Sequence, residues 1–274
     1  MLDSFRHLLL IAEHGTFTEA ARRAHLSQPA LTTSIRRLEE RIGARLFVRS
    51  RRGAELTAAG RAVLPHARAA LVATDEARRA AAEIEGLAAG EVRIGGGATV
   101  CTYLLPPLLA QFRRRHPNLA LRIRELHTDA ALDALSRGAL DLAIVPTSRG
   151  ELFRRDELIL VASPGVDPAT ASFVTLARGT TTRELLDRHF PNADIAMELG
   201  SLAVVKGHVR AGLGVALISR SAVALDLAHG RLVEIRNPAT PIRRPFRLLH
   251  RGLDRLSPSA LELRRTLLPG TGSR

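Results

Sequence analysis

The sequence lacks several residues and patterns on which whole protein classes depend. It contains no tryptophan, one tyrosine and one cysteine among 274 residues. A single cysteine excludes an intramolecular disulfide bond. The chain has neither an apolar run of about 18 residues nor the N-terminal apolar segment of a secretory signal peptide. We therefore expect a cytoplasmic protein that does not bind membranes.

The sequence also lacks the short motifs of common enzyme classes. It has no P-loop, no His-Glu-x-x-His, no paired Cys-x-x-Cys and no Gly-x-Ser-x-Gly. Gly95–Gly97 follows a predicted strand and is similar to a dinucleotide-binding loop. However, Val100 stands where that loop requires glycine or alanine. We expect no catalytic residue, no metal and no cofactor.

Positive charge is abundant and almost entirely arginine, because Lys206 is the only lysine. The net charge is +13 and the isoelectric point about 11.5, which suits a polyanionic partner. Residues 1–88 carry only +4 of it, from 14 basic and 10 acidic groups. Local density is more informative, since residues 36–61 contain eight arginines and three glutamates.

Residues 15–57 have the pattern of a helix-turn-helix followed by an arginine-rich wing. Thr16 and Thr18 stand where a first helix begins, and His25-Leu26 interrupts it. Ser27 is a strong N-cap type for a second helix, and Pro29 is tolerated in its first turn. This second helix has an apolar stripe at steps of four, three and four: Leu31, Ile35, Leu38 and Ile42.

The opposite face of the second helix carries groups that can meet base edges and phosphates in a major groove. Amide, hydroxyl and guanidinium side chains are all present there. This face therefore predicts binding to double-stranded DNA. Its members are Gln28, Thr32, Thr33, Arg36 and Arg37.

A long alanine-rich helix is predicted from Ala58 to about Ala88, with Pro65 bending it or marking the start of its regular part. Small and apolar residues recur in it at alternating steps of four and three, which is typical of a coiled-coil seam. This seam predicts self-association. It consists of Val63, Ala67, Ala70, Thr74, Ala77, Ala81, Ile84 and Ala88.

Short apolar strands alternate with helices from Glu91 onward, which favours largely parallel sheets. The predicted strands are 92–95, 119–125, 140–145, 158–162, 195–199 and 215–219. The predicted helices are 104–116, 129–137, 182–190, 201–211 with Gly212 as a C-cap, and 259–268.

From Leu2 to about Leu268 the chain resembles the LysR-type transcriptional regulators. The most specific segment is GTFTEAARRAHLSQPALTTSIRRLEERIGARLFVRSRRGAELTAAG, residues 15–60. Three later segments resemble the family in the same order: LLPPLLAQFRRRHPNLALRI (104–123), GALDLAIV (138–145) and VRAGLGVALISRSAV (209–223).

The resemblance implies an α+β architecture. An N-terminal all-α winged helix-turn-helix (1–57) and a linker helix (58–89) that dimerises would precede an effector-binding domain (90–270) similar to periplasmic binding proteins. That domain would have two α/β subdomains, I (about 91–156 and 225–268) and II (about 157–224). The resemblance further implies a small-molecule effector in the cleft between them, dimers or tetramers, and promoter DNA as target, with RNA polymerase as a further candidate partner.

Two departures from the family pattern affect these expectations. Many relatives have Ser-Arg-Gln where this chain has Thr32-Thr33-Ser34, so its base preference is expected to differ. The connection between Val145 and Leu158 is short and the region to Met197 is compact, which predicts a trimmed second subdomain with a smaller or more open cleft.

We assign DNA contacts to the second helix, the start of the first and the wing. Hydroxyls and helix-terminal amides suit phosphates, and Gln28 and Arg36 suit base edges. If these arginines instead formed a solvated face, their partners would be Glu39, Glu40 and Glu55. The predicted DNA-binding residues are Thr16, Thr18, Gln28, Pro29, Thr32, Thr33, Arg36, Arg49, Arg51 and Arg52.

We assign effector contacts to places where a strand ends and a helix begins, since first-turn amides favour an anion such as a small carboxylate. Each hydroxyl could equally be an N-cap alone, and Gly179-Thr180 is a weaker candidate. His127 could be a packed or solvent-facing side chain, and Cys101 could have a lowered pKa at a helix start. The predicted residues are Thr99, Val100, Cys101, Thr102, His127, Thr128, Thr147 and Ser201.

The sequence is also compatible with three alternatives to an effector-controlled regulator. A trimmed second subdomain would leave a regulator without ligand. A solute-binding protein would fit residues 90–270 alone, although the N-terminal 88 residues and the missing signal peptide count against it. A small-molecule enzyme is disfavoured by the missing motifs.

Overall fold

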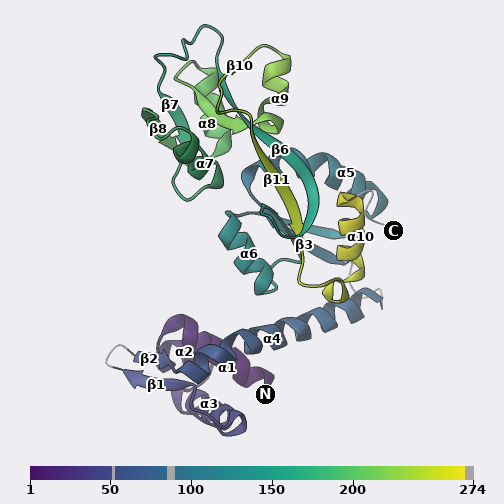
Figure 1. Cartoon of the computed structure of the whole chain (residues 1–274). Coiled ribbons are helices and arrows are strands. Elements are labelled where there is room, and N and C mark those ends of the chain that lie inside the picture. The colour runs from purple at the N-terminus through teal and green to yellow at the C-terminus, as the bar shows by residue number, and fades with distance from the viewer. Residues whose placement is uncertain (51–52, 85–89, 269–274) are drawn as a thin grey trace. The chain divides into compact units, whose positions relative to one another are not determined.

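The computed structural model describes residues 1–50, 53–84 and 90–268. The chain forms two compact units, Met1–Glu85 and Gly86–Arg274, and each is described by itself (Figure 1). None of the described helices is long and apolar enough to cross a membrane.

The N-terminal unit is a three-helix core with a two-stranded wing and a long last helix. Ser27 caps α3 as expected, because its Oγ accepts a hydrogen bond from the Ala30 amide at 3.3 Å. His25 has a left-handed backbone (φ 54°) in the turn between α2 and α3. The elements are α1 (Leu2–His14), α2 (Phe17–Arg23), α3 (Gln28–Ile42), β1 (Phe47–Ser50), β2 (Gly53–Leu56) and α4 (Ala58–Ile84).

Two sequence-based expectations for this unit need correction. Leu31, Ile35 and Leu38 are buried, but Ile42 is 39% exposed because it is the last residue of α3 and extends past the core. The predicted seam on α4 is not free along its whole length. Ala67 is fully buried in the core of the unit itself, and Val63 packs beside it. Only later seam positions such as Ala77 are exposed, and Ala88 lies outside the described residues.

The C-terminal unit contains a seven-stranded sheet of order β10-β6-β11-β5-β3-β4, with β9 also paired to β6, and a two-stranded sheet β7-β8. Its strands are β3 (Glu91–Gly96), β4 (Ala120–Glu125), β5 (Leu142–Pro146), β6 (Glu151–Ala162), β7 (Phe173–Leu176), β8 (Ile195–Leu199), β9 (Ala216–Ser219), β10 (Val233–Ile235) and β11 (Ile242–Leu249). Its helices are η1 (Thr99–Leu104, a π-helix), α5 (Leu105–Arg115), α6 (Thr128–Ser136), α7 (Thr181–His189), α8 (Leu202–Arg210), α9 (Arg220–Ala228), η2 (Leu253–Arg255) and α10 (Pro258–Leu267).

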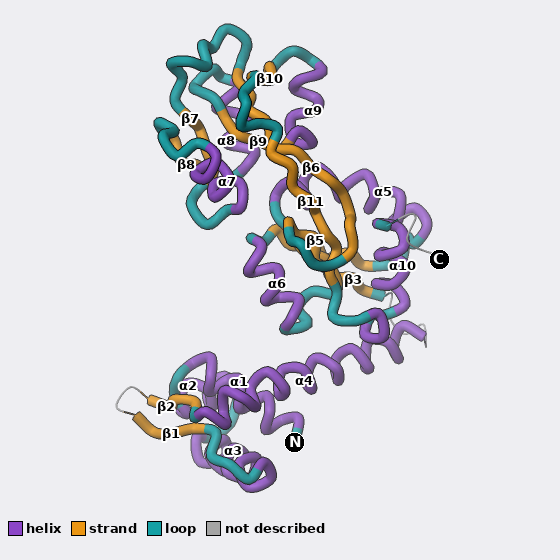
Figure 2. Tube along the Cα trace, in the orientation of Figure 1, coloured by secondary structure: helices purple, strands orange, loops and turns teal. Residues whose placement is uncertain are grey.

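Two large hydrophobic clusters divide this unit into two lobes. Lobe 1 is built on β3, η1, α5, β5 and α10, and its cluster includes Ile94, Phe112 and Leu263. Lobe 2 is built on β7, α8, β9 and α9, and its cluster includes Val174, Val209 and Ile218. The long strands β6 and β11 lie side by side (Figures 1 and 2), and β6 contributes to the clusters of both lobes. β11 contributes Phe246 and Leu248 to lobe 1, and its Ile242 packs with Leu217 of β9 and Leu186 of α7 in a smaller cluster.

The expectation of largely parallel sheets is wrong for the larger sheet. The pairs β3-β4 and β3-β5 are parallel, but every pairing of β6 and β11 is antiparallel. The sequence pattern missed β7, β10, β11 and α9, and it placed only residues 158–162 of β6 in a strand. Strand direction is set by partners far along the chain, here 151–162 with 242–249, which a local pattern does not contain.

Candidate DNA interface and ligand cleft

The exposed face of α3 is the first candidate site. Its buried stripe packs on α1 and α2 in the unit's core, so the opposite side turns outward. Gln28, Pro29, Thr33 and Arg36 are exposed there, and Thr32 is half-buried. The Thr32 hydroxyl donates to the Gln28 carbonyl at 2.9 Å. The structure thus brings these five residues of the predicted set to one surface.

Arg36 has a partner on its own helix. Its Nε lies 3.3 Å from Oε1 of Glu40, and both side chains are largely exposed. Such a surface ion pair contributes little to stability, typically up to about 1 kcal/mol, so an approaching phosphate can replace the glutamate.

Glu39 is not part of a solvated charged face. Its carboxylate accepts hydrogen bonds from the amides of Leu46 and Phe47, at 2.7 and 3.3 Å, and ties α3 to β1.

The start of α2 and the wing are held together by a close backbone contact. The Ala54 amide donates to the Gly15 carbonyl at 2.7 Å. Gly53 has φ 123°, and a Cβ there would lie 2.3 Å from that same carbonyl, so only glycine fits. The Thr16 hydroxyl caps α2 by accepting from the Glu19 amide, while Thr18 is exposed.

The wing arginines of the prediction fall mostly outside the described part of the chain. Arg49 belongs to β1, but its side chain is not among the described groups. Arg51 and Arg52 lie outside the described residues altogether. Their assignment to DNA therefore remains a prediction from sequence.

The second candidate site is a cavity of about 270 Å³ in the cleft between the lobes. Lobe 1 contributes the turn after β3 and the start of α6, where Thr99, His127 and Thr128 lie. The first turns of α7 and α8 contribute Thr181 and Ser201. The Thr128 and Thr181 hydroxyls lie 3.3 Å apart across the cleft. Three helix N-termini thus border one cavity, and each favours negative charge.

Arg244 is the charged centre of this cavity wall. It is 7% exposed, and its Nε lies 2.9 Å from Oδ2 of Asp156, its directly opposite partner on β6. One Nη donates to the Thr99 hydroxyl at 3.1 Å and the other to the Thr182 hydroxyl at 3.2 Å. The guanidinium also lies 4.8 Å from the centre of the Phe246 ring. One buried cation therefore connects η1 of lobe 1 to α7 on the other side of the cleft.

Asp156, the partner of Arg244, is itself fully engaged. It is 3% exposed and accepts further hydrogen bonds from the hydroxyls of Ser219 and Ser221, at 2.8 and 3.3 Å. A buried charge pair is tolerated only when such additional hydrogen bonds satisfy both groups. The pair thus fixes β6 against β11 at the base of the cleft.

Half of the predicted effector residues line the cavity. Thr99, His127, Thr128 and Ser201 do so, as does the weaker candidate Thr180. The others are absent from its wall: Val100, Cys101, Thr102 and Thr147. The predicted helix 104–116 is preceded by a further helical segment, since residues 99–104 form the π-helix η1, in which buried Val100 and Leu104 pack in lobe 1.

Cys101 is not a reactive thiol in this structure. Burial raises the pKa of its thiol to about 11, and nearby Glu125 acts in the same direction. Its Sγ lies 3.3 Å from the Gly96 carbonyl, to which it donates. The thiol therefore stays protonated near neutral pH.

Arg244, Ser219 and Phe246 belong to the cavity wall and were missed by the sequence reasoning. A signal was present, because the residues of β11 alternate between buried and exposed. That alternation places Arg244 on the same face as Ile242 and Phe246. An arginine on the apolar side of an alternating strand indicates a paired or ligand-binding charge.

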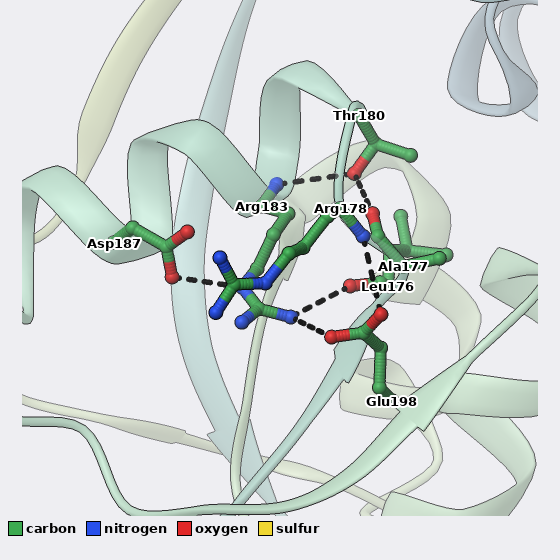
Figure 3. A network of polar contacts seen from close by, with 7 residues as sticks. All are labelled: Leu176, Ala177, Arg178, Thr180, Arg183, Asp187 and Glu198. Carbon is green, nitrogen blue, oxygen red and sulfur yellow. Dashed lines mark hydrogen bonds and ion pairs between the residues drawn. The ribbon is translucent and has the colours of Figure 1, made fainter.

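A second buried arginine positions the first turn of α7 at the cleft (Figure 3). The Arg183 side chain is 4% exposed and bonds to Asp187 at 2.8 Å and Glu198 at 2.6 Å. The hydrogen bond from Arg183 lowers the pKa of Glu198. The Thr180 hydroxyl accepts from the Arg183 amide and donates to the Ala177 carbonyl, which fixes the start of the helix.

Comparison with known proteins matches both units. Residues 2–61 match the family model of bacterial regulatory helix-turn-helix proteins of the lysR family, and residues 85–271 match the LysR substrate binding domain. The chain is similar to the RuBisCO operon transcriptional regulator of Allochromatium vinosum, with 32% identity over 97% of this chain and 95% of the relative. It is also 32% identical to the probable RuBisCO transcriptional regulator of Cyanidioschyzon merolae, over 89% of each chain.

Solved structures share the fold. ArgP from Mycobacterium tuberculosis aligns with a TM-score of 0.69 and 21% identity, covering 96% of this chain and 94% of that one. Full-length CbnR complexed with its target DNA aligns with a TM-score of 0.63 and 20% identity, covering 97% and 98%.

Proposed function

The chain belongs to the LysR family of transcriptional regulators, and from that premise we propose that α3 and the wing read promoter DNA under the control of a small anion bound in the cleft. Regulation by DNA binding follows from membership of the family. The residues, the class of effector and the assembly are the parts we propose. The proposal includes no catalytic step.

The observation that carries the DNA assignment is the exposed polar face of α3, capped and packed so that its side chains point outward. Gln28 can make paired hydrogen bonds to adenine, and Arg36 can reach guanine or a phosphate. Hydroxyls near the start of α2 suit phosphates. The proposed contact residues are Thr16, Thr18, Gln28, Pro29, Thr32, Thr33, Arg36, Arg49, Arg51 and Arg52.

Replacing Gln28 with alanine is expected to separate base reading from phosphate binding. Gln28→Ala should weaken the cognate duplex by about 1 to 3 kcal/mol and relax base preference at specific positions. Arg51→Ala should weaken cognate and random duplexes similarly and reduce the salt slope by about one. Fluorescence anisotropy with both duplexes measures each affinity. Equal losses on both duplexes for both variants would contradict this division of roles.

The proposed effector is a small anion such as a carboxylate. The helix N-termini of α6, α7 and α8 favour negative charge in the part of the cavity that they border, and the Arg244 guanidinium adds donors there, although Asp156 balances its charge and Glu125 also lines the cavity. Hydroxyls of Thr99, Thr128 and Ser201 can donate to carboxylate oxygens. Because β6 contributes to both lobes and β11 is paired with it, a ligand touching both lobes would shift the balance between open and closed arrangements.

We further propose that the chain works as a dimer or tetramer joined through α4. We divide it into a DNA-binding domain (1–57), a linker (58–89) and an effector-binding domain (90–270) with subdomains at about 91–156 plus 225–268 and 157–224. Support comes from the coiled-coil spacing of α4 beyond Ala67, where Ala70, Thr74 and Ala77 follow on one face.

Ala77→Glu is expected to release monomers, because it places a charge in an apolar seam. Light scattering of the full chain measures the mass. The matched control is Ala69→Glu, since Ala69 is exposed, lies off the seam and gives the same charge change on the same helix. An unchanged mass for Ala77→Glu would rule out this part of α4 as the contact.

A further inference from the structure

A cluster of three cations around one buried carboxylate lies on lobe 2, away from the cleft. Asp226 of α9 is 2% exposed and is approached by three side chains. Lys206 Nζ lies 3.2 Å from it, Arg231 Nε 2.9 Å and Arg210 Nε 3.6 Å. Burial acts to raise the pKa of Asp226, but the hydrogen bond and charge of Lys206 and the two arginines outweigh it and lower that pKa. The carboxylate is therefore charged, and the cluster has three positive charges and one negative, a net +2.

The two arginines use only part of their hydrogen-bonding capacity on Asp226. The shortest approach of each is through Nε, and no hydrogen bond to the described residues uses their Nη atoms. Their side chains are 44% and 45% exposed. Lys206 is more enclosed, with its Nζ also donating to the Ala222 carbonyl and lying 5.1 Å from the Tyr103 ring centre. Lys206 thus balances the charge of Asp226 on its enclosed side. The Nη atoms of Arg210 and Arg231 can therefore donate to another anion.

The two arginines border an open pocket of about 550 Å³. Its wall consists of Ser163, Pro164, Gly207, Arg210, Ala211 and Arg231, and it shares no residue with the cleft cavity. Gly207 is an interior residue of α8, where glycine costs about 0.5 to 1 kcal/mol relative to alanine. A Cβ at Gly207 would meet nothing within 4 Å. Packing against neighbouring residues does not require this glycine, and the space beside it stays open on the pocket wall.

We infer that this pocket binds the phosphoryl group of a phosphate monoester, as a second anion site that goes beyond the proposed function of the cleft. Guanidinium forks match phosphate oxygens in paired hydrogen bonds. A phosphate monoester carries a charge of about −1.5 to −2 near neutral pH, which balances the net +2 of the cluster. The Ser163 hydroxyl, on the pocket wall, supplies a further donor.

The test is calorimetric titration of the full chain with methyl phosphate, with acetate at the same ionic strength as the class control. The binding that the pocket variants remove should be at least about tenfold tighter for methyl phosphate than for acetate, because paired hydrogen bonds from the guanidinium groups and the matching charge favour phosphate. Arg210→Gln should weaken methyl phosphate binding about tenfold or more. It removes only a 3.6 Å contact to Asp226, so folding should be kept. Arg188→Gln, an exposed arginine on α7, is the charge-matched control and should bind as wild type.

Gly207→Glu is a second variant that leaves the Asp226 ion pairs in place. Glutamate is a good helix former, and its carboxylate would compete for the guanidinium forks. This variant should therefore lose methyl phosphate binding while keeping its DNA affinity. Undetectable methyl phosphate binding by wild type, methyl phosphate binding that Gly207→Glu leaves unchanged, or acetate binding that the pocket variants weaken as much as methyl phosphate binding would each overturn the inference. The pocket variants separate this site from the cleft, because the cleft shares no residue with the pocket and keeps any ligand it binds.

Discussion

Replacing Arg244 with methionine is expected to cost the C-terminal unit about 3 to 5 kcal/mol of unfolding free energy, because Asp156 would remain buried without its cation. Because the hydroxyls of Ser219 and Ser221 would still donate to Asp156, we expect a loss of unfolding free energy near the lower end of this range. Urea unfolding followed by circular dichroism measures it. The control is Arg243→Met, the adjacent residue on β11, whose side chain is 85% exposed and lies 3.6 Å from Glu157. Arg243→Met should lower the unfolding free energy by less than about 1 kcal/mol.

The double variant Arg244→Met/Asp156→Asn distinguishes the charge pair from simple packing. It should recover much of the lost stability, because no uncompensated charge remains buried. It should also lose any rise in melting temperature that small carboxylates produce in wild type and in Arg243→Met, since the charge facing the ligand is gone. An Arg244→Met protein as stable as Arg243→Met would show that the pair does not hold β6 and β11 together.

Thr33→Glu is expected to weaken DNA binding by at least about 100-fold. Thr33 is exposed at the centre of the α3 face, and a carboxylate there would meet phosphates or the electronegative groove, a like-charge contact that costs several kcal/mol. Glutamate is a good helix former, so the fold should be unaffected. Ala69→Glu is again the matched control and should keep wild-type affinity in fluorescence anisotropy. If Thr33→Glu weakens DNA affinity by less than about threefold, the DNA interface does not include the exposed face of α3.

Local sequence signals were sufficient to predict the start and the buried face of α3 in the DNA-binding unit. Ser27 and Pro29 identify the start of α3, and the spacing of Leu31, Ile35 and Leu38 identifies its buried face. These signals work because caps and helical periodicity are properties of neighbouring residues. Ile42 is the exception, since burial at the last residue of a helix depends on what packs beyond it.

The cleft was only partly predictable, because its chemistry depends on pairings between distant residues. Helix starts such as Thr128 and Ser201 were found from local composition. Arg244 was missed because its role requires Asp156, 88 positions away on β6, and Thr99, 145 positions away in η1. A local pattern does not say which strands pair or in which direction, so it cannot place two such charges together.

The affinity of the full chain for the duplex upstream of its own gene, measured across a salt series, tests the central claim most directly. Each phosphate neutralised by an arginine releases counterions, so the logarithm of the association constant should fall linearly with the logarithm of salt concentration, by about 0.9 per phosphate contact. Binding should be tightest at the lowest salt and stronger than to a random duplex. No complex at low salt, or an affinity that does not change with salt, would contradict the assignment of this chain as a regulator that reads DNA through α3 and its wing.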